Sequence, residues 1–260
     1  MVDFLDVLVK DAEKTVNEGY YKIGAVKSEK RNQSLKNHIL KCEHAPVIAE
    51  IKPASPSHGK LRNITNIKKI VKAIENGGAV GISVLTEPKH FEGSLKLLAE
   101  VRRCTELPIL MKDIIVDPVQ IETASKIGAN AILLIASIYR RNCTSHSIHE
   151  MIKLAHAENL EVLLETHDKE EFLCALETQA DLIGINNRNL QNLSVDLRVT
   201  QKILSEIGGC NRVVVSESGI QNPADIQFLR KCGAHAFLVG SAIMLADDIE
   251  ARVKELVNAL

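Results

Sequence analysis

Charged and amide side chains stand at the ends of several short apolar runs in this 260-residue sequence. Two of these run ends carry a lysine together with a carboxylate, and the others carry a glutamate, or an asparagine followed by an arginine. The residues are Glu50, Lys52, Lys112, Asp113, Glu165, Asn186, Arg188 and Glu217. Lysines and carboxylates that converge in a partly desolvated place shift one another's pKa values, so they can serve as general acids and bases. We therefore predict an acid–base site, provided that the fold brings the run ends together.

The alternative for each of these residues is a structural role. Lys and Glu lie mostly on protein surfaces, and a ring of salt bridges would also place charges at strand ends. One charged run end would therefore carry no argument for function. Because several run ends in this chain carry such groups, the pattern favours a functional cluster.

Eight apolar runs of strand length recur along the chain, and segments with a helical period separate them. The runs cover residues 47–52, 79–85, 108–113, 130–136, 161–166, 181–186, 212–217 and 235–240. They are continuous and rich in β-branched residues, which is typical of parallel strands buried on both faces. Eight such units favour an α/β fold, a closed (β/α)8 TIM barrel. An open doubly wound sheet is the alternative, but its G-x-G-x-x-G turn does not follow the first run, where KPASPSHG stands.

We expect one barrel domain over residues 1–260, with residues 1–45 as an N-terminal helical extension. The extension carries two helical patterns, roughly at residues 3–18 and 28–40, which GYYKIG separates. It is too short to bury a core of its own, so we expect an extension of the barrel and not a second domain.

Composition excludes several classes of protein. Apolar residues make up 45% of the chain, so a large core can be buried. The net charge is −1 without a long basic run, so we expect no nucleic-acid partner. No apolar run approaches the roughly 20 residues of a membrane span, and acids interrupt the apolar residues of the N-terminus, which argues against a signal peptide. The six cysteines are scattered, which is typical of reduced thiols, so we expect a cytoplasmic protein.

A second signal is a candidate phosphate site late in the chain. In a barrel the active site lies at the C-terminal strand ends, and the loops after strands seven and eight often bind phosphate. Here the last two runs are followed by Ser218-Gly219 and Gly240-Ser241, where glycine lets backbone N–H groups approach an anion. Further charge and hydrogen bonds would come from Lys52, Ser55 and Arg188. Barrel loops also need glycines for turns, so this signal is less specific than the charged run ends.

The histidines give no metal site. His146 and His149 are three residues apart on an expected helix start, but no third ligand follows with a recognisable spacing, so we expect a solvated face and no metal. His167 follows Glu165 closely and could line the mouth of the barrel, but a role in a turn is favoured.

Six segments resemble those of the indole-3-glycerol-phosphate synthase family, in the right order and over nearly the whole chain. They are IAEIKPASPSHG, ILMKDIIVDPVQI, LLETHD, IGINNRNL, VVSESGI and FLVGSAIM, and the N-terminal helix with GYY also matches. Other phosphate-binding barrels share the late glycines but lack the Glu-x-Lys and Lys-Asp pairs. The resemblance implies that the substrate is 1-(2-carboxyphenylamino)-1-deoxyribulose 5-phosphate. Ring closure with loss of carbon dioxide and water would give indole-3-glycerol phosphate, without a cofactor, in tryptophan biosynthesis.

The resemblance also implies roles for individual residues. Lys112 would be the general acid of ring closure, Glu165 or Lys52 would assist dehydration, and Glu50 would position the lysines and the substrate. Polar groups of the substrate would bind to Asn186 and Glu217. The phosphate would lie near Ser55, Arg188, Ser218, Gly219, Gly240 and Ser241. The anthranilate ring would contact Phe91, Leu133, Leu190, Leu193 and Leu238.

The sequence departs from the family pattern at three places. Ile114 stands where the family often has Phe, Pro53-Ala54 stand where a basic residue is common after the lysine, and Asn189 replaces a frequent Asp. These departures concern the ring pocket and the attraction of phosphate rather than the acid–base groups.

Two other functions remain open from the residues alone. One is another phosphosugar barrel enzyme, such as an isomerase or a Schiff-base aldolase that uses a strand-end lysine as nucleophile. The other is a barrel without catalytic activity that binds a metabolite or scaffolds a partner. For the synthase and for the other phosphosugar enzyme alike, we expect a small phosphorylated substrate. We expect the chain to be a monomer or a weak homodimer.

Overall fold

Eight parallel strands close into a barrel in this computed structural model, which describes residues 3–24, 32–55, 59–62 and 64–260. Around the barrel the hydrogen-bonded order is β1, β10, β9, β8, β7, β6, β5 and β4. The strands are β1 (Val47–Ile51), β4 (Gly81–Leu85), β5 (Ile109–Lys112), β6 (Ala131–Ile135), β7 (Glu161–Thr166), β8 (Leu182–Asn186), β9 (Val213–Glu217) and β10 (Ala236–Val239). The predicted (β/α)8 barrel is therefore confirmed, and the open doubly wound sheet is excluded.

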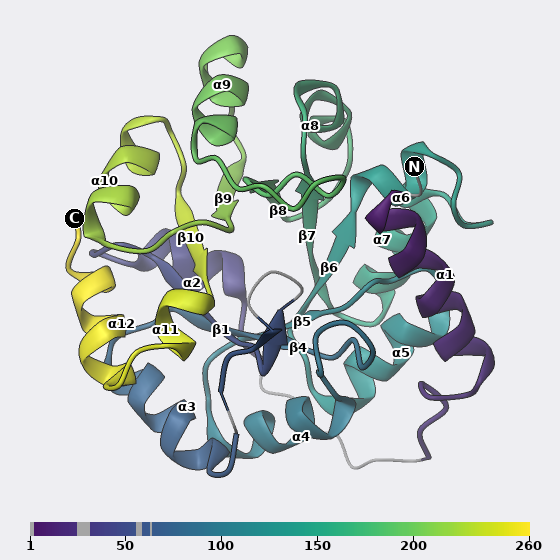
Figure 1. Cartoon of the computed structure of the whole chain (residues 1–260). Coiled ribbons are helices and arrows are strands. Elements are labelled where there is room, and N and C mark those ends of the chain that lie inside the picture. The colour runs from purple at the N-terminus through teal and green to yellow at the C-terminus, as the bar shows by residue number, and fades with distance from the viewer. Residues whose placement is uncertain (1–2, 25–31, 56–58, 63) are drawn as a thin grey trace.

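Most of the helices form a ring outside the barrel (Figure 1). The helices are α1 (Phe4–Asn17), α2 (Leu35–Lys41), α3 (Ile67–Asn76), α4 (Leu95–Cys104), α5 (Pro118–Ile127), α6 (Ala136–Arg140), α7 (Ile148–Ala157), α8 (Lys169–Leu176), α9 (Arg198–Ile207), α10 (Pro223–Lys231), α11 (Ser241–Met244) and α12 (Ile249–Val257). Of these, α2 and α11 lie closer to the strands (Figure 1). Two helices begin as the sequence indicates, because Asp117 and Asn222 each form a capping box before a proline at the first helical position.

Burial explains why the strand sequences are continuous rather than alternating. Every residue of β1, β4, β6, β8, β9 and β10 is buried, because side chains point either into the barrel or against the helices. The buried carboxyl and amide residues of these strands, Glu50, Asn186 and Glu217, lie at or next to the C-terminal ends of their strands. The fold therefore places the charged run ends at one end of the barrel, as the sequence predicts.

The N-terminal extension packs on the barrel, with one helix shorter than predicted. Helix α1 agrees with the prediction for residues 3–18. Helix α2 begins only at Leu35, because the Ser34 side chain accepts the backbone N–H of Asn37 as its N-cap. The prediction of helix from residue 28 is thus wrong for residues 32–34, and residues 28–31 lie outside the described residues.

A short ribbon and helix α6 do not appear in the sequence pattern. The loop after β1 folds into a two-stranded ribbon of β2 (Ala54–Ser55) and β3 (Gly59–Lys60). Helix α6 begins directly after β6, and α11 begins one residue after β10, with Gly240 as its N-cap. None of the described helices combines the length and the apolar character that crossing a membrane requires.

Candidate active site

A cavity of about 370 Å³ opens at the C-terminal ends of the strands. This volume is typical of small-molecule sites. Each sequence-predicted site residue whose side chain is described lines it: Glu50, Lys52, Phe91, Lys112, Leu133, Glu165, Asn186, Arg188, Leu190, Leu193, Glu217, Ser218, Gly219, Leu238, Gly240 and Ser241. The backbone of Ser55 belongs to β2, but its side chain lies outside the described part of the chain. The predicted residues therefore meet in one place, and their roles stay predictions.

Lys112 ends β5 and lies between two buried glutamates. Its Nζ atom is 3.3 Å from Glu165 Oε2 and 3.5 Å from Glu217 Oε2. Burial alone would lower the pKa of Lys112, but Glu165, Glu217 and Glu50 outweigh it and hold that pKa above its ordinary value. Lys112 therefore carries its proton at neutral pH, as a proton donor must.

The two glutamates beside Lys112 differ in charge. Burial alone would raise the pKa of Glu165, but Lys112 and His167 outweigh it and hold that pKa well below its ordinary value. In Glu217 burial prevails, helped by the nearby carboxylates of Glu165 and Glu50, and raises the pKa to about 8. Neither carboxyl oxygen of Glu217 has a hydrogen-bond partner among the described residues. At neutral pH Glu165 is thus a carboxylate, and Glu217 is mostly a neutral acid.

Glu50 and Lys52 form a second acid–base pair at the end of β1. Lys52 Nζ lies 2.9 Å from Glu50 Oε1, and the other oxygen of Glu50 has no hydrogen-bond partner within the described structure. A Cβ atom at Gly240 would lie 2.5 Å from Glu50 Oε1 and 3.2 Å from Lys52 Nζ. Gly240, which the sequence assigns to phosphate binding, therefore has a further reason to be glycine: the pair occupies the space beside it.

A glycine inside the barrel makes room for the central carboxyl groups. Gly184 lies in β8, and a Cβ atom there would collide with Glu217 Oε1 and lie 3.3 Å from Glu165 Cα. Any side chain at this position would push Glu217 away from Lys112.

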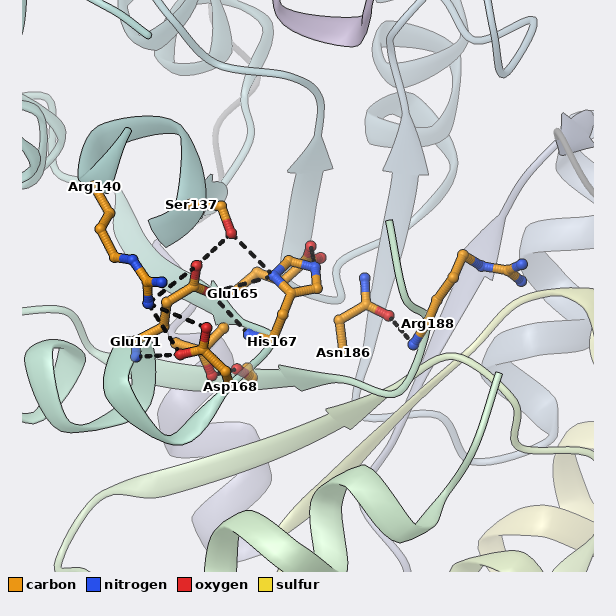
Figure 2. A network of polar contacts seen from close by, with 10 residues as sticks. Ser137, Arg140, Glu165, His167, Asp168, Glu171, Asn186 and Arg188 are labelled. Atoms are coloured by element: carbon orange, nitrogen blue, oxygen red, sulfur yellow. Dashed lines mark hydrogen bonds and ion pairs between the residues drawn. The ribbon is translucent and has the colours of Figure 1, made fainter. Parts of the chain in front are cut away.

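The loop after β8 brings one cation and two leucines to the cavity. Asn186 Oδ1 accepts the backbone N–H of Arg188 at 3.0 Å (Figure 2). Arg188 Nη1 donates to Leu193 O at 3.0 Å. Asn189, one of the departures from the family pattern, accepts two backbone N–H groups of the same loop. Through these bonds the loop folds back on itself, so Leu190 and Leu193 face the cavity.

The apolar wall includes several residues that the sequence reasoning missed, and two of them come from α1. Phe4 and Leu8 of α1 line the cavity beside Ile114. Helix α1 is held there by Asp11, which contacts Lys89 at 3.2 Å and His90 at 2.8 Å. The amphipathic pattern of α1 predicts a buried face, but no local signal indicates that this face closes a cavity.

Asp113 has a structural task although it stands at a strand end beside Lys112. It accepts hydrogen bonds from Tyr21 Oη at 2.9 Å, Thr86 Oγ1 at 2.5 Å and the backbone N–H of Ile114 at 2.8 Å. Burial raises the pKa of Asp113 to about 6, and these hydrogen bonds oppose the rise. Asp113 therefore joins the N-terminal segment to β5. This hydrogen bond gives Tyr21, which follows the first helix, a structural role.

His167 lies in the bend after β7 and does not line the cavity, as the sequence predicts, but the sequence does not predict its contacts. The sequence assigns it to a turn, but its ring Nε2 lies 3.2 Å from Glu165 Oε1 and its Nδ1 lies 3.4 Å from Glu171 Oε2 (Figure 2). The signal that could have found it is its place two residues after Glu165, where a strand's side chains return to the same face. Its second partner is on the next helix, and the local pattern does not reveal it.

Comparison with known proteins gives a consistent result. The family model for indole-3-glycerol phosphate synthase matches residues 5–256. A protein of this name from Methanocaldococcus jannaschii is 41% identical, over 98% of this chain and 88% of its own length. Another from Lachnospira eligens is 38% identical, over 98% of both chains. Among solved structures, a thiamine phosphate pyrophosphorylase from Pyrococcus furiosus is similar with a TM-score of 0.62 and 20% identity, over 87% of this chain and 97% of that one, which shows the fold alone. The chain belongs to the indole-3-glycerol phosphate synthase family.

Proposed function

We propose that this chain converts 1-(2-carboxyphenylamino)-1-deoxyribulose 5-phosphate into indole-3-glycerol phosphate, carbon dioxide and water. The observation that carries the proposal is the place of Lys112 in the cavity, where its Nζ lies 3.3 Å from Glu165 Oε2 and 3.5 Å from Glu217 Oε2. The names of the relatives support the choice of substrate.

The first step is ring closure. The aromatic carbon that bears the carboxylate attacks the ketone carbon of the ribulose part, and negative charge develops on the ketone oxygen. Lys112 donates its proton to that oxygen, and the resulting alcohol is far less acidic than an ammonium group, so the transfer is favourable. Loss of carbon dioxide then restores the aromatic ring. Glu217, whose carboxyl oxygens have no hydrogen-bond partner in the described structure, supplies a group for the substrate's polar atoms.

The second step is dehydration, which needs one acid and one base. The new hydroxyl group leaves as water after it receives a proton, and a proton leaves the ring system. We assign the base to Glu165, because its low pKa keeps it ionised. We assign the acid to Lys52, whose ammonium group lies 2.9 Å from Glu50 Oε1 at the opposite side of the cavity. Glu50 orients Lys52.

Besides the acid–base groups, the cavity has a phosphate region and an apolar wall, and both bind the substrate. The phosphate lies near Arg188 and the loops after β9 and β10, at Ser218, Gly219, Gly240 and Ser241. Burial lowers the pKa of Arg188, but a guanidinium group stays charged at neutral pH. The anthranilate ring lies against the apolar wall, which includes Ile114 in place of the frequent Phe.

Turnover of the purified protein tests this function. We expect the chain to form an indole product, seen by fluorescence, with one carbon dioxide released per indole. Absence of turnover with intact substrate would overturn the proposal. Borohydride treatment in the presence of a carbonyl substrate tests the aldolase alternative. We expect no covalent adduct at Lys112, because a protonated lysine is no nucleophile, and an adduct there would favour a Schiff-base enzyme.

A further inference from the structure

His167 lies just beyond Glu165, and the proposed reaction gives it no task. Its ring Nε2 is 3.2 Å from Glu165 Oε1. Its Nδ1 is 3.4 Å from Glu171 Oε2 and 3.5 Å from Ser137 Oγ. Figure 2 shows the ring beside both carboxylates. The contact of Nε2 with Glu165 is an ion pair by distance and lies outside hydrogen-bond geometry. A protonated imidazole carries a proton on both nitrogens, and its charge suits a place between two carboxylates.

Glu171, the outer partner, is itself fixed by three elements. Its side chain is only 4% exposed. Ser137 Oγ of α6 donates to Glu171 Oε1 at 2.5 Å, and the backbone N–H of His167 donates to Glu171 Oε2 at 2.9 Å. Asp168, the N-cap of α8, accepts the backbone N–H of Glu171 at 2.7 Å. Arg140 lies 3.9 Å from Glu171 and 3.1 Å from Asp168. The imidazole is therefore held by a rigid support.

The inner partner, Glu165, has a cation on each of its two oxygens. Lys112 lies 3.3 Å from Oε2, and His167 lies 3.2 Å from Oε1. Rotation of the carboxylate would break both contacts, so its plane is fixed. Groups that support a reacting side chain from behind in this way often control its orientation and basicity.

The charge of the imidazole follows from its neighbours. Burial alone would lower the pKa of His167, but Glu165 and Glu171 outweigh burial and raise it to about 9. More distant charges also face this group: Asp3 at the start of α1, Arg140 of α6, Lys112 of β5, Asp168 before α8 and Glu217 of β9. At neutral pH the ring is therefore an imidazolium.

We propose that His167 is a positioning residue: held by Glu171 and Ser137, it orients the Glu165 carboxylate toward the cavity and balances its charge. This inference rests on the proposed function, in which Glu165 is the base of dehydration. A purely structural histidine would matter for stability only. A positioning histidine also sets the pH range in which Glu165 works.

The kinetic test compares His167→Gln with the wild type. Glutamine has a similar reach and can donate one hydrogen bond, but it carries no charge. We expect kcat to fall by roughly tenfold or more, as for other groups that support a reacting residue, while KM changes by less than about twofold. The acid limb of the kcat–pH profile should move to higher pH, because Glu165 loses one of its two cations. The alkaline limb that follows loss of the imidazolium proton should disappear.

Two further variants complete the kinetic test. Glu171→Gln removes one of the two carboxylates that hold the imidazolium proton, so the alkaline limb should move to lower pH. His156→Gln is the matched control, because His156 lies 3.0 Å from Asp181 in a histidine–carboxylate pair that does not line the cavity. Its pH profile should equal that of the wild type. If His167→Gln and Glu171→Gln keep the wild-type profile, the positioning role is overturned.

A titration by nuclear magnetic resonance separates this inference from the proposed function. The ring nitrogens of His167 report its protonation without any turnover. We expect a pKa well above that of an ordinary histidine, and Glu165→Gln should lower it. If the wild type shows this titration but does not turn over the substrate, the proposed function fails and the contact between His167 and Glu165 stands. If Glu165→Gln leaves the pKa of His167 unchanged, the inference fails even in an active enzyme.

Discussion

At the scale of residues, two glutamates in the same cavity differ in their protonation state. Glu165 and Glu217 both lie within 3.5 Å of Lys112, yet only Glu165 also contacts an imidazole. Its pKa falls while that of Glu217 rises to about 8. Environments that push apart the pKa values of two like groups are what an acid–base reaction requires. The strand ends thus supply the groups, and their neighbours decide the protonation states.

Glu217→Gln should change how stability depends on pH. The pKa of Glu217 is about 8 in the folded chain, compared with the ordinary value of 4.5 that we expect in the unfolded chain. The folded state therefore binds this proton more tightly than the unfolded state does. The contribution of Glu217 to the free energy of unfolding is fully present below pH 4.5 and is lost as the pH rises to about 8. We expect urea denaturation to show a smaller loss of stability over this range in the variant than in the wild type.

A surface glutamate gives the control for this measurement. Glu122→Gln changes an exposed residue that pairs with Lys126 at 3.3 Å. Its stability should follow the wild-type dependence on pH. An unchanged dependence in Glu217→Gln as well would mean that Glu217 has no raised pKa.

At the scale of elements, helix α1 is part of the site rather than an accessory. Its residues Phe4 and Leu8 line the cavity, and Arg141 after α6 contacts Asp3 at 2.6 Å. The Phe4 ring packs edge-on against His90, with centroids 5.7 Å apart. The helix therefore forms a wall that the barrel strands cannot provide, because they end below it.

Phe4→Ala should weaken substrate binding more than chemistry. The change removes apolar surface from the cavity wall, and loss of about 1.4 kcal/mol of contact energy corresponds to a tenfold weaker affinity. We expect KM to rise by up to about tenfold in steady-state assays, with kcat changed by less than about threefold. Val7→Ala, on the same helix but away from the cavity, should leave KM unchanged. A normal KM in Phe4→Ala would remove α1 from the binding site.

At the scale of the whole molecule, the two ends of the barrel have different tasks. The C-terminal end holds the cavity. Toward the other end Arg102 of α4, only 1% exposed, donates to Asn130 Oδ1 at 3.1 Å, to Leu107 O at 3.2 Å and to Thr105 O. These bonds join a helix to the segments that precede β5 and β6. Barrels generally separate stability and catalysis in this way.

Arg102→Met should therefore lower stability without affecting catalysis. The variant leaves buried carbonyl oxygens without their donor, at a cost of about 1–3 kcal/mol. For a chain of this size each kcal/mol lowers Tm by roughly 2–4 °C. We expect a lower Tm in calorimetry and a kcat/KM within about twofold of the wild type at 25 °C. Arg103→Met, on the exposed side of the same helix, should change neither quantity. A large loss of kcat/KM in folded Arg102→Met would contradict this division.

Much of the fold and of the site can be predicted from local sequence. Strands buried on both faces must be continuous apolar runs, so their number and order are visible. Glu50, Lys112 and Glu165 interrupt or end such runs, and a barrel gathers strand ends at one face. The residues that escape prediction depend on contacts between distant segments. His167 needs Glu171 and Ser137 from two helices, and Phe4 needs the path of the whole extension. Protonation states depend on burial and on all nearby charges, so sequence gives the residue but not its pKa.

Replacement of Lys112 tests the central claim most directly, because the proposed ring closure depends on its proton. Lys112→Ala should lower kcat by roughly two to four decades, the usual contribution of a general acid. Lys126→Ala, which changes an exposed lysine of α5, is the matched control and should keep the wild-type kcat. Both are measured with the fluorescence assay for indole formation under saturating substrate, on protein shown to be folded. A kcat for Lys112→Ala within about twofold of the wild type would contradict the account.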